Sequence, residues 1–358
     1  MTKSKILYLT GLVILLLMPL VQAKNRKGMQ LFTADNPNIQ YTGRIDFSNP
    51  KLPRFWSPGV YIQAKFKGGR CSLILHDEVQ YNTTHNYIEI SIDQQQPYRI
   101  QLKGKTDTLT VPSGLSGEAH IITVCKDSET GYVTLEGIIC EQLLPLPEKP
   151  AHSIEYIGDS ITVGTGSDLS VIPCDKGQWY DQQNAYLSYG PLSARQLNAR
   201  WQLTAVSGIG MIHSCCENKT LMPEVFDKVN LRENSLPWNF KRYQPDVVTI
   251  CLGQNDGVQD SVKFTSSYIG FIKTLRAQYP AAAIVCLTSP MADAKLTRVL
   301  KNYLRGIVQQ VNALGDQKVS HYFFSKQFSH GCGGHPDLAD HRLMAVEVAN
   351  YIKKLERW

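Results

Sequence analysis

The sequence of 358 residues has no long run of basic residues, no internal repeat and no low-complexity tract. Charged residues make up 19% of the chain, and the formal net charge is +6. A dedicated nucleic-acid-binding protein gathers its basic residues on one face or segment, so we expect no nucleic-acid partner. The composition also excludes collagen-like, coiled-coil and multi-spanning membrane proteins. The 43% of hydrophobic residues is ample for a buried core and excludes a largely disordered chain.

An apolar run from Ile6 to Val21 follows two lysines near the start of the chain. It leads into Val21-Gln22-Ala23, a small-residue pattern that is typical of a signal-peptide cleavage site. We therefore predict a signal peptide over residues 1–23 and no membrane span after its removal, with an uncleaved anchor as the alternative. Because the first cysteine is Cys71, none lies beside the cleavage site to carry a lipid. The mature protein is expected to be secreted or periplasmic.

Between Val60 and about Cys140, apolar residues alternate with polar ones. Successive side chains of a strand point to opposite faces, so this period of two gives each strand one buried and one solvated side. Turn-forming segments such as Pro112-Ser113-Gly114 separate the alternating stretches. Many short strands at this spacing predict an antiparallel, jelly-roll-like β-sandwich over residues 24–145.

A stretch with three prolines, from Leu143 to Pro150, interrupts this pattern, and we place a linker at residues 146–152. The apolar runs that follow do not alternate, which is typical of parallel strands buried on both faces by helices. Residues 153–358 are therefore expected to form an α/β domain. The runs are Ile154–Ile157, Leu203–Val206, Val247–Leu252 and Ile284–Leu287, with helical spacing near residues 268–275, 299–311 and 338–355.

Four short segments come after these predicted strands or before the last helix. Because the carboxyl ends of parallel strands meet at one sheet edge, where α/β folds bind ligands, we expect the segments to converge. Taken alone, the serine of the first segment could simply cap a helix. The segments are Gly158-Asp159-Ser160, Ser207-Gly208-Ile209-Gly210, Gly253-Gln254-Asn255-Asp256 and the loop from Gly331 that delivers His335.

In this order the segments resemble those of the SGNH (GDSL-like) hydrolase superfamily, which has a flavodoxin-like α/β fold. The stretch from Pro237 to Asp256 and the preceding β-sandwich are most similar to carbohydrate esterase family 2. Members of that family join a jelly-roll-like domain to an SGNH domain and remove acetyl groups from plant polysaccharides. The resemblance implies an O-acetyl esterase acting on xylan or glucomannan, with an acetylated oligo- or polysaccharide as its partner. It implies no metal and no other cofactor, and we expect a monomer.

The resemblance also implies the catalytic roles. Ser160 would attack the ester carbonyl, and His335 would take its proton and return it to the leaving sugar hydroxyl. The oxyanion would be held by the amides of Ser160 and Gly208 and by the side chain of Asn255. Gly210 is the alternative to Gly208, because the turn carries both glycines.

The position three residues before the histidine, an aspartate in most of the wider superfamily, is Cys332. Family 2 is similar in lacking this acid, and there a backbone carbonyl orients the imidazole. We therefore expect a Ser-His dyad, with the loop Cys332–Gly334 setting the tautomer of His335 through its main chain. Asp337 is the alternative partner, although its position also suits a cap of the last helix.

The nine cysteines are an odd number, so at least one is unpaired. Because adjacent cysteines rarely bridge one another, we predict that Cys174 pairs with either Cys215 or Cys216 and that Cys332 pairs with the other. A zinc site built on Cys332 and the neighbouring histidines is disfavoured by the lack of paired ligand motifs. Cys251 and Cys286 lie in apolar strand runs and are expected to be inert core thiols, whereas Cys71, Cys125 and Cys140 lie on strands of the predicted sandwich and indicate no function.

Aromatic side chains are candidate substrate-binding residues, because flat rings stack on the apolar faces of sugars. Trp179, Tyr180 and Trp238 are the candidates, and Asp159 is another, although Trp238 could equally be a core residue. Two rival functions remain open. One is an SGNH esterase or thioesterase for lipid or other acyl esters, and the other is a carbohydrate-binding protein with a vestigial hydrolase site.

Overall fold

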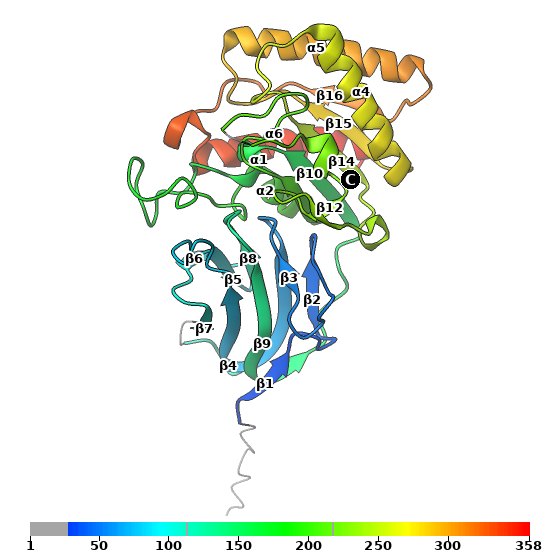
Figure 1. Ribbon diagram of the computed structural model, residues 1–358. Coiled ribbons are helices and arrows are strands. Elements are labelled where there is room, and N and C mark those ends of the chain that lie inside the picture. Colours follow the sequence, from blue (N-terminus) through cyan, green and yellow to red (C-terminus); the bar gives the residue numbers. More distant parts are fainter. Residues whose placement is uncertain (1–27, 112–113, 217) are drawn as a thin grey trace, which may run out of the picture.

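The computed structural model describes residues 28–111, 114–216 and 218–358. The predicted signal peptide, residues 1–23, lies outside the described residues. In the part of the chain that is described, no helix is both long and apolar enough to cross a membrane. An all-antiparallel β domain is followed by an α/β domain, and the two are stacked end to end (Figure 1). The predicted fold class is thereby confirmed.

The β domain is organised around one long strand, β4 (Tyr61–Asp77). The first half of β4 pairs with β2 and β8, whereas its second half pairs with β7 and β9, so the sheet folds over a shared apolar core. The other strands are β1 (Gln30–Thr33), β2 (Ile39–Thr42), β3 (Arg54–Phe55), β5 (Tyr87–Ile92), β6 (Tyr98–Gln101), β7 (Thr106–Thr110), β8 (Ala119–Lys126) and β9 (Val133–Leu144).

The expectation of one solvated side per strand is wrong for β5. Glu89 and Ser91, its polar residues, are each only 3% exposed, because the α/β domain covers that face. The side chain of Asn184 in the α/β domain donates a hydrogen bond to Glu89 at 3.1 Å. Burial and the neighbouring charge of Asp127 raise the pKa of Glu89 to about 10. The polar positions of β5 therefore face the α/β domain, whereas the alternation predicted that they face solvent.

The α/β domain contains a five-stranded parallel sheet in the order β11-β10-β14-β15-β16, which is the flavodoxin-like order. Helices α4 and α5 cover one face, and α2 and α6 cover the other (Figure 1). The strands are β10 (His152–Gly158), β11 (Ala199–Ala205), β14 (Val247–Cys251), β15 (Ala283–Leu287) and β16 (Val319–Tyr322). The helices are α1 (Ser160–Val163), α2 (Tyr189–Gln196), α3 (Met222–Val225), α4 (Ser261–Gln278), α5 (Ala294–Ala313) and α6 (Leu338–Glu356), and β12 (Lys228–Asn230) and β13 (Ser235–Pro237) form a hairpin.

The elements of the α/β domain follow from local sequence signals. Asp260, Asp293 and Asp337 each accept a backbone N–H in the first turn of a long helix, which satisfies an amide that the helix leaves unpaired. The four predicted apolar runs correspond to β10, β11, β14 and β15. The sequence reading missed β16, because Val-Ser-His-Tyr on the sheet edge is half-buried rather than apolar throughout.

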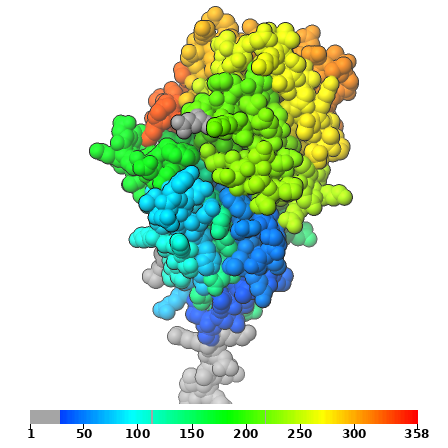
Figure 2. Space-filling model, in the orientation of Figure 1, coloured from blue at the N-terminus to red at the C-terminus, as the bar shows by residue number. Residues whose placement is uncertain are grey.

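The two domains share a buried interface on the β10–β11 side of the sheet. Their surface atoms are in contact on the face that Figure 2 shows. The fully buried guanidinium of Arg44 in the β domain pairs with Glu155 at 3.0 Å. The ring of Tyr61 stacks on Trp201 with a centroid separation of 3.9 Å, and Trp201 Nε1 donates to the carbonyl of Gly59 at 3.0 Å. The α/β domain therefore sits on the β domain in one fixed orientation.

Candidate active site

The turn from β10 into α1 presents Ser160 at the carboxyl edge of the sheet. A side chain at Gly158 would have its Cβ 2.0 Å from the Thr162 hydroxyl, so the turn requires glycine. Asp159 caps α1, with Oδ1 accepting the Ile161 amide at 3.0 Å. Asp159 is 0% exposed and is not among the residues that line the pocket described below, so its assignment to substrate binding is wrong.

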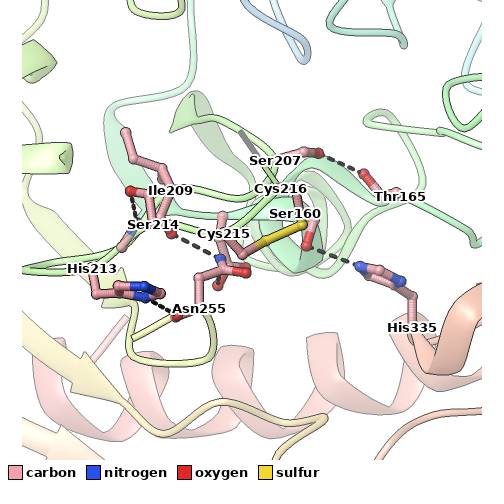
Figure 3. The surroundings of a disulfide bond; sticks show 12 residues. Ser160, Thr165, Ser207, Ile209, His213, Ser214, Cys215, Cys216, Asn255 and His335 are labelled. Atoms are coloured by element: carbon pink, nitrogen blue, oxygen red, sulfur yellow. Dashed lines mark hydrogen bonds between the residues drawn. A yellow bond between two sulfur atoms is a disulfide. The ribbon is translucent and has the colours of Figure 1, made fainter. Parts of the chain in front are cut away.

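Ser160 and His335 point toward one another at the base of a pocket (Figure 3). Ser160 Oγ lies 2.9 Å from His335 Nε2, and His335 Nδ1 lies 3.2 Å from the backbone carbonyl of Cys332. The carbonyl can only accept, so Nδ1 carries the proton and Nε2 is free to accept the hydroxyl proton of Ser160. Asp337 caps α6 through the Asp340 amide at 2.7 Å and makes no such contact with His335.

Two residues that line the same pocket have unused backbone amides. The N–H groups of Ser160 and Gly208 have no acceptor among the described residues. Gly208 has a left-handed φ of 84°, and a Cβ there would lie 3.1 Å from the Cys215 carbonyl. The amide of Gly210, the alternative donor, is already used by the Ser214 hydroxyl at 3.0 Å. Of the two glycines, Gly208 has the available donor.

The side chain of Asn255 also lines the pocket, but its amide nitrogen already has two acceptors. Asn255 Nδ2 donates to the carbonyl of Ile209 at 2.8 Å and to Asp159 Oδ2 at 3.2 Å. Burial raises the pKa of Asp159 to about 7, and the charge of Asp256 adds to this effect. Both hydrogens of the Asn255 amide are therefore engaged, and the contact to Asp159 is the longer of the two.

Asp256 has a structural role that was not predicted from the sequence. Its carboxylate accepts the amides of Met211, Ile212 and His213 at 2.7–3.0 Å, which orders the loop after Gly208. His213 Nδ1 adds a contact of 3.0 Å to the Asn255 carbonyl (Figure 3). The only available signal was the acid directly after Asn255 in the sequence.

The pocket has a volume of about 820 Å³ and is lined by both domains. Trp179 and Tyr180, two of the predicted substrate-binding residues, both line the pocket, and Trp179 is 49% exposed. Trp238 does not line it; this residue is 7% exposed and packs with Val229 and Tyr243, so its assignment to substrate binding is wrong. From the β domain the wall receives Gln80, Tyr81, Thr84, Glu129 and Thr130, none of which the sequence singled out.

Comparison with known proteins identifies the family to which this fold belongs. Residues 41–147 match the family described as Carbohydrate esterase 2 N-terminal, and residues 156–323 match the GDSL-like Lipase/Acylhydrolase family. A solved family two carbohydrate esterase from Clostridium thermocellum is 30% identical, with a TM-score of 0.81 over 89% of this chain and 99% of that one. The chain belongs to carbohydrate esterase family 2.

Two further relatives of this family 2 esterase have named activities. An acetylxylan esterase / glucomannan deacetylase of Cellvibrio japonicus is 28% identical over 340 residues, which is 91% of each protein. Cellulase/esterase CelE of Acetivibrio thermocellus is 30% identical over 341 residues, which is 90% of this chain; the chain spans only 40% of the length of CelE. By family, the chain is an ester hydrolase.

The cysteine pairing in this family 2 esterase differs from the prediction. The disulfides join Cys174 to Cys332 and Cys215 to Cys216, so both predicted pairings are wrong. The backbone N–H of Asn218 donates to the Cys215 carbonyl at 3.0 Å, a contact that spacing alone did not reveal. Cys251 and Cys286 are free and buried, which confirms the prediction of core thiols, and so are Cys71, Cys125 and Cys140. No group of metal-ligating side chains gathers within the described ranges.

The Cys174–Cys332 disulfide holds the carbonyl that contacts His335, so its removal should disturb catalysis as well as stability. For Cys174→Ser we expect the free energy of unfolding to fall by about 2–4 kcal/mol, since the bond closes a long loop. We expect kcat to fall about tenfold, because the imidazole loses its fixed orientation. Urea unfolding and steady-state kinetics measure the two effects. An unchanged kcat would show that the carbonyl stays in place without the bond.

The pH dependence of the esterase should reflect the burial of its histidine. Burial lowers the pKa of His335, and the hydrogen bond with Cys332 offsets only part of that effect. Only the neutral imidazole accepts a proton, and its fraction falls as the pH drops through this pKa. The acid limb of kcat/KM for p-nitrophenyl acetate should therefore have its midpoint below about 6.5, the ordinary histidine value. A midpoint above that value would contradict the effect of burial.

Proposed function

We propose that this family 2 esterase removes acetyl groups from acetylated polysaccharide of the xylan or glucomannan type, with Ser160 and His335 as the catalytic dyad. The observation that carries the proposal is the 2.9 Å contact between Ser160 Oγ and His335 Nε2 at the base of a pocket with two unused amides. The named activity of the Cellvibrio relative supports the substrate class. Export by the signal peptide over residues 1–23 is part of the proposal.

The first half of the reaction forms an acetyl-enzyme. Ser160 Oγ bonds to the acetyl carbonyl carbon while its proton moves to His335 Nε2. The carbonyl oxygen gains the negative charge and is held by the amides of Ser160 and Gly208. When the tetrahedral intermediate collapses, the bond to the sugar oxygen breaks and His335 gives that oxygen the proton.

The second half releases acetate. Water attacks the acetyl-serine carbonyl and gives a proton to His335 Nε2, and Ser160 recovers that proton as acetate leaves. Asn255 can join the oxyanion site in both halves by exchanging its 3.2 Å contact with Asp159 for the developing oxyanion. The neutral Cys332 carbonyl keeps the tautomer of His335 fixed through both proton transfers.

The lining of the pocket favours a sugar ester over a lipid ester. Among the described residues that line it, Met291 is the only aliphatic side chain, and the rest are polar, aromatic, cysteine or glycine. A long acyl chain would need an apolar channel, whereas Tyr81, Trp179 and Tyr180 offer rings for a sugar. The solved Clostridium thermocellum relative is described in complex with cellohexaose, which supports an oligosaccharide ligand.

Acetate release tests the proposal directly. Purified protein is incubated with acetylated xylan, acetylated glucomannan and p-nitrophenyl octanoate, and released acid is measured enzymatically or chromatographically. We expect acetate from at least one glycan at a kcat/KM that exceeds that for octanoate. Preference for octanoate would favour the lipid esterase instead. Binding of the glycan without acetate release would favour the vestigial carbohydrate-binding function.

A further inference from the structure

The β domain sends a buried carboxylate into the turn that carries the Gly208 amide. Glu129 lies between β8 and β9, and its side chain is 4% exposed. Its Oε2 accepts the backbone N–H of Ser207, the residue before Gly208, at 2.9 Å. We propose that Glu129 is a positioning residue that fixes the oxyanion hole across the domain boundary. This inference rests on the proposed function of the Ser160 site.

The α/β domain also holds the main chain of Glu129. The backbone N–H of Glu129 donates to Gln183 Oε1 at 2.9 Å, and Gln183 Nε2 donates to the Thr165 hydroxyl at 3.2 Å. That hydroxyl lies 2.9 Å from the hydroxyl of Ser207 (Figure 3). Ser207 is therefore held through its main chain by Glu129 and through its side chain by Thr165.

The contacts that Glu129 and Thr165 make with Ser207 restrict the orientation of the backbone N–H of Gly208. Gly208 has a left-handed φ of 84°. Because glycine has no Cβ, this residue can change to other backbone conformations at little cost unless its neighbours are held. On its far side, the Gly208 carbonyl accepts the Cys215 amide at 2.8 Å. Glu129 thus fixes the peptide between Val206 and Ser207, and Cys215 fixes the peptide that follows Gly208. The peptide that carries the Gly208 N–H lies between these two fixed peptides. An oxyanion hole works because such donors are oriented before the reaction.

A carboxylate near a developing oxyanion would oppose catalysis unless its charge were compensated. The guanidinium of Arg232, in the segment after β12, forms an ion pair with Glu129 Oε1. The same guanidinium lies 5.6 Å from the centroid of the Trp179 ring. Arg232 thus cancels the charge of Glu129 and ties the oxyanion turn to the aromatic rim of the pocket.

Five variants, one of them a control, test this assignment with p-nitrophenyl acetate, a small ester that needs no glycan contact. For Glu129→Ala we expect kcat to fall on the order of 10- to 100-fold with KM changed less than about twofold, because only the oxyanion donor is misaligned. Glu129→Gln keeps an oxygen for the Ser207 amide and should stay within about fivefold of the wild type. Glu118→Ala, at an exposed glutamate of the same domain, is the control and should match the wild type.

Arg232→Gln and the double variant Glu129→Gln/Arg232→Gln complete a cycle. The single variant leaves a buried carboxylate unpaired, so we expect the double variant to be more active than Arg232→Gln alone. If Glu129→Ala does not fold, as thermal melting would reveal, this cycle decides the question. An unchanged kcat for folded Glu129→Ala, a loss confined to KM, or a double variant no better than Arg232→Gln would overturn the assignment. Wild-type protein with no hydrolysis, or hydrolysis independent of Ser160, would instead overturn the proposed function.

Discussion

The Ser160→Ala variant should release acetate about 10⁴- to 10⁶-fold more slowly than the wild type, because the atom that forms the acetyl-enzyme is gone. The oxyanion donors at Gly208 and Asn255 remain, so a residual rate above that of water alone is expected. The variant should fold normally, since Ser160 Oγ makes its contact with His335 at the pocket and not within the core. The measurement is kcat for acetate release from acetylated xylan, together with thermal melting.

Ser170→Ala is the matched control for this variant, because Ser170 is an exposed serine on the loop that follows α1. It should keep the wild-type rate. Brief treatment with an organophosphate that labels nucleophilic serines provides an independent readout: one phosphoryl group per wild-type chain is expected and none per Ser160→Ala chain. Wild-type activity in Ser160→Ala would place the nucleophile elsewhere.

The His335→Ala variant should lose almost as much activity as Ser160→Ala, about 10³- to 10⁶-fold, because an unassisted serine hydroxyl is a weak nucleophile at neutral pH. The double variant with Ser160→Ala should be no slower than Ser160→Ala itself, since the two residues act as one unit. Added imidazole should restore part of the activity of His335→Ala by occupying the vacated space as a free base. Rates with and without imidazole, at fixed pH, measure this rescue.

His330→Ala is the control for the histidine. His330 lies five residues earlier on the same loop, with a side chain that is 67% exposed and paired with Asp340. Its removal should leave kcat unchanged and reduce stability only slightly. A large loss in His330→Ala combined with normal activity in His335→Ala would reverse the roles of the two residues.

The sequence predicted the convergence of Ser160, Gly208, Asn255 and His335 well, and the reason is physical. Parallel strands share one carboxyl edge, so residues that follow separate strands must meet there whatever lies between them. The structure places all four around one pocket, although it also shows the amide of Asn255 already engaged by Ile209 and Asp159. No strand spacing could have revealed that engagement.

Residues from the β domain were invisible to the same reasoning. Tyr81 and Glu129 lie on connections between strands of the β domain, and nothing in their local pattern distinguishes them from ordinary loop residues. They reach the pocket only because of how the two domains dock, which depends on buried partners such as Arg44 and Glu155. The disulfide partners escaped prediction for a similar reason, because loop proximity depends on tertiary contacts.

The shared wall of the pocket makes the β domain part of the enzyme and not a detachable binding module. Each domain has its own apolar core and could collapse early during folding, whereas the site exists only once the domains have docked. Recovery of catalytic activity after dilution from denaturant should therefore lag behind the recovery of secondary structure. Esterase activity in this protein is in effect a reporter of interdomain assembly.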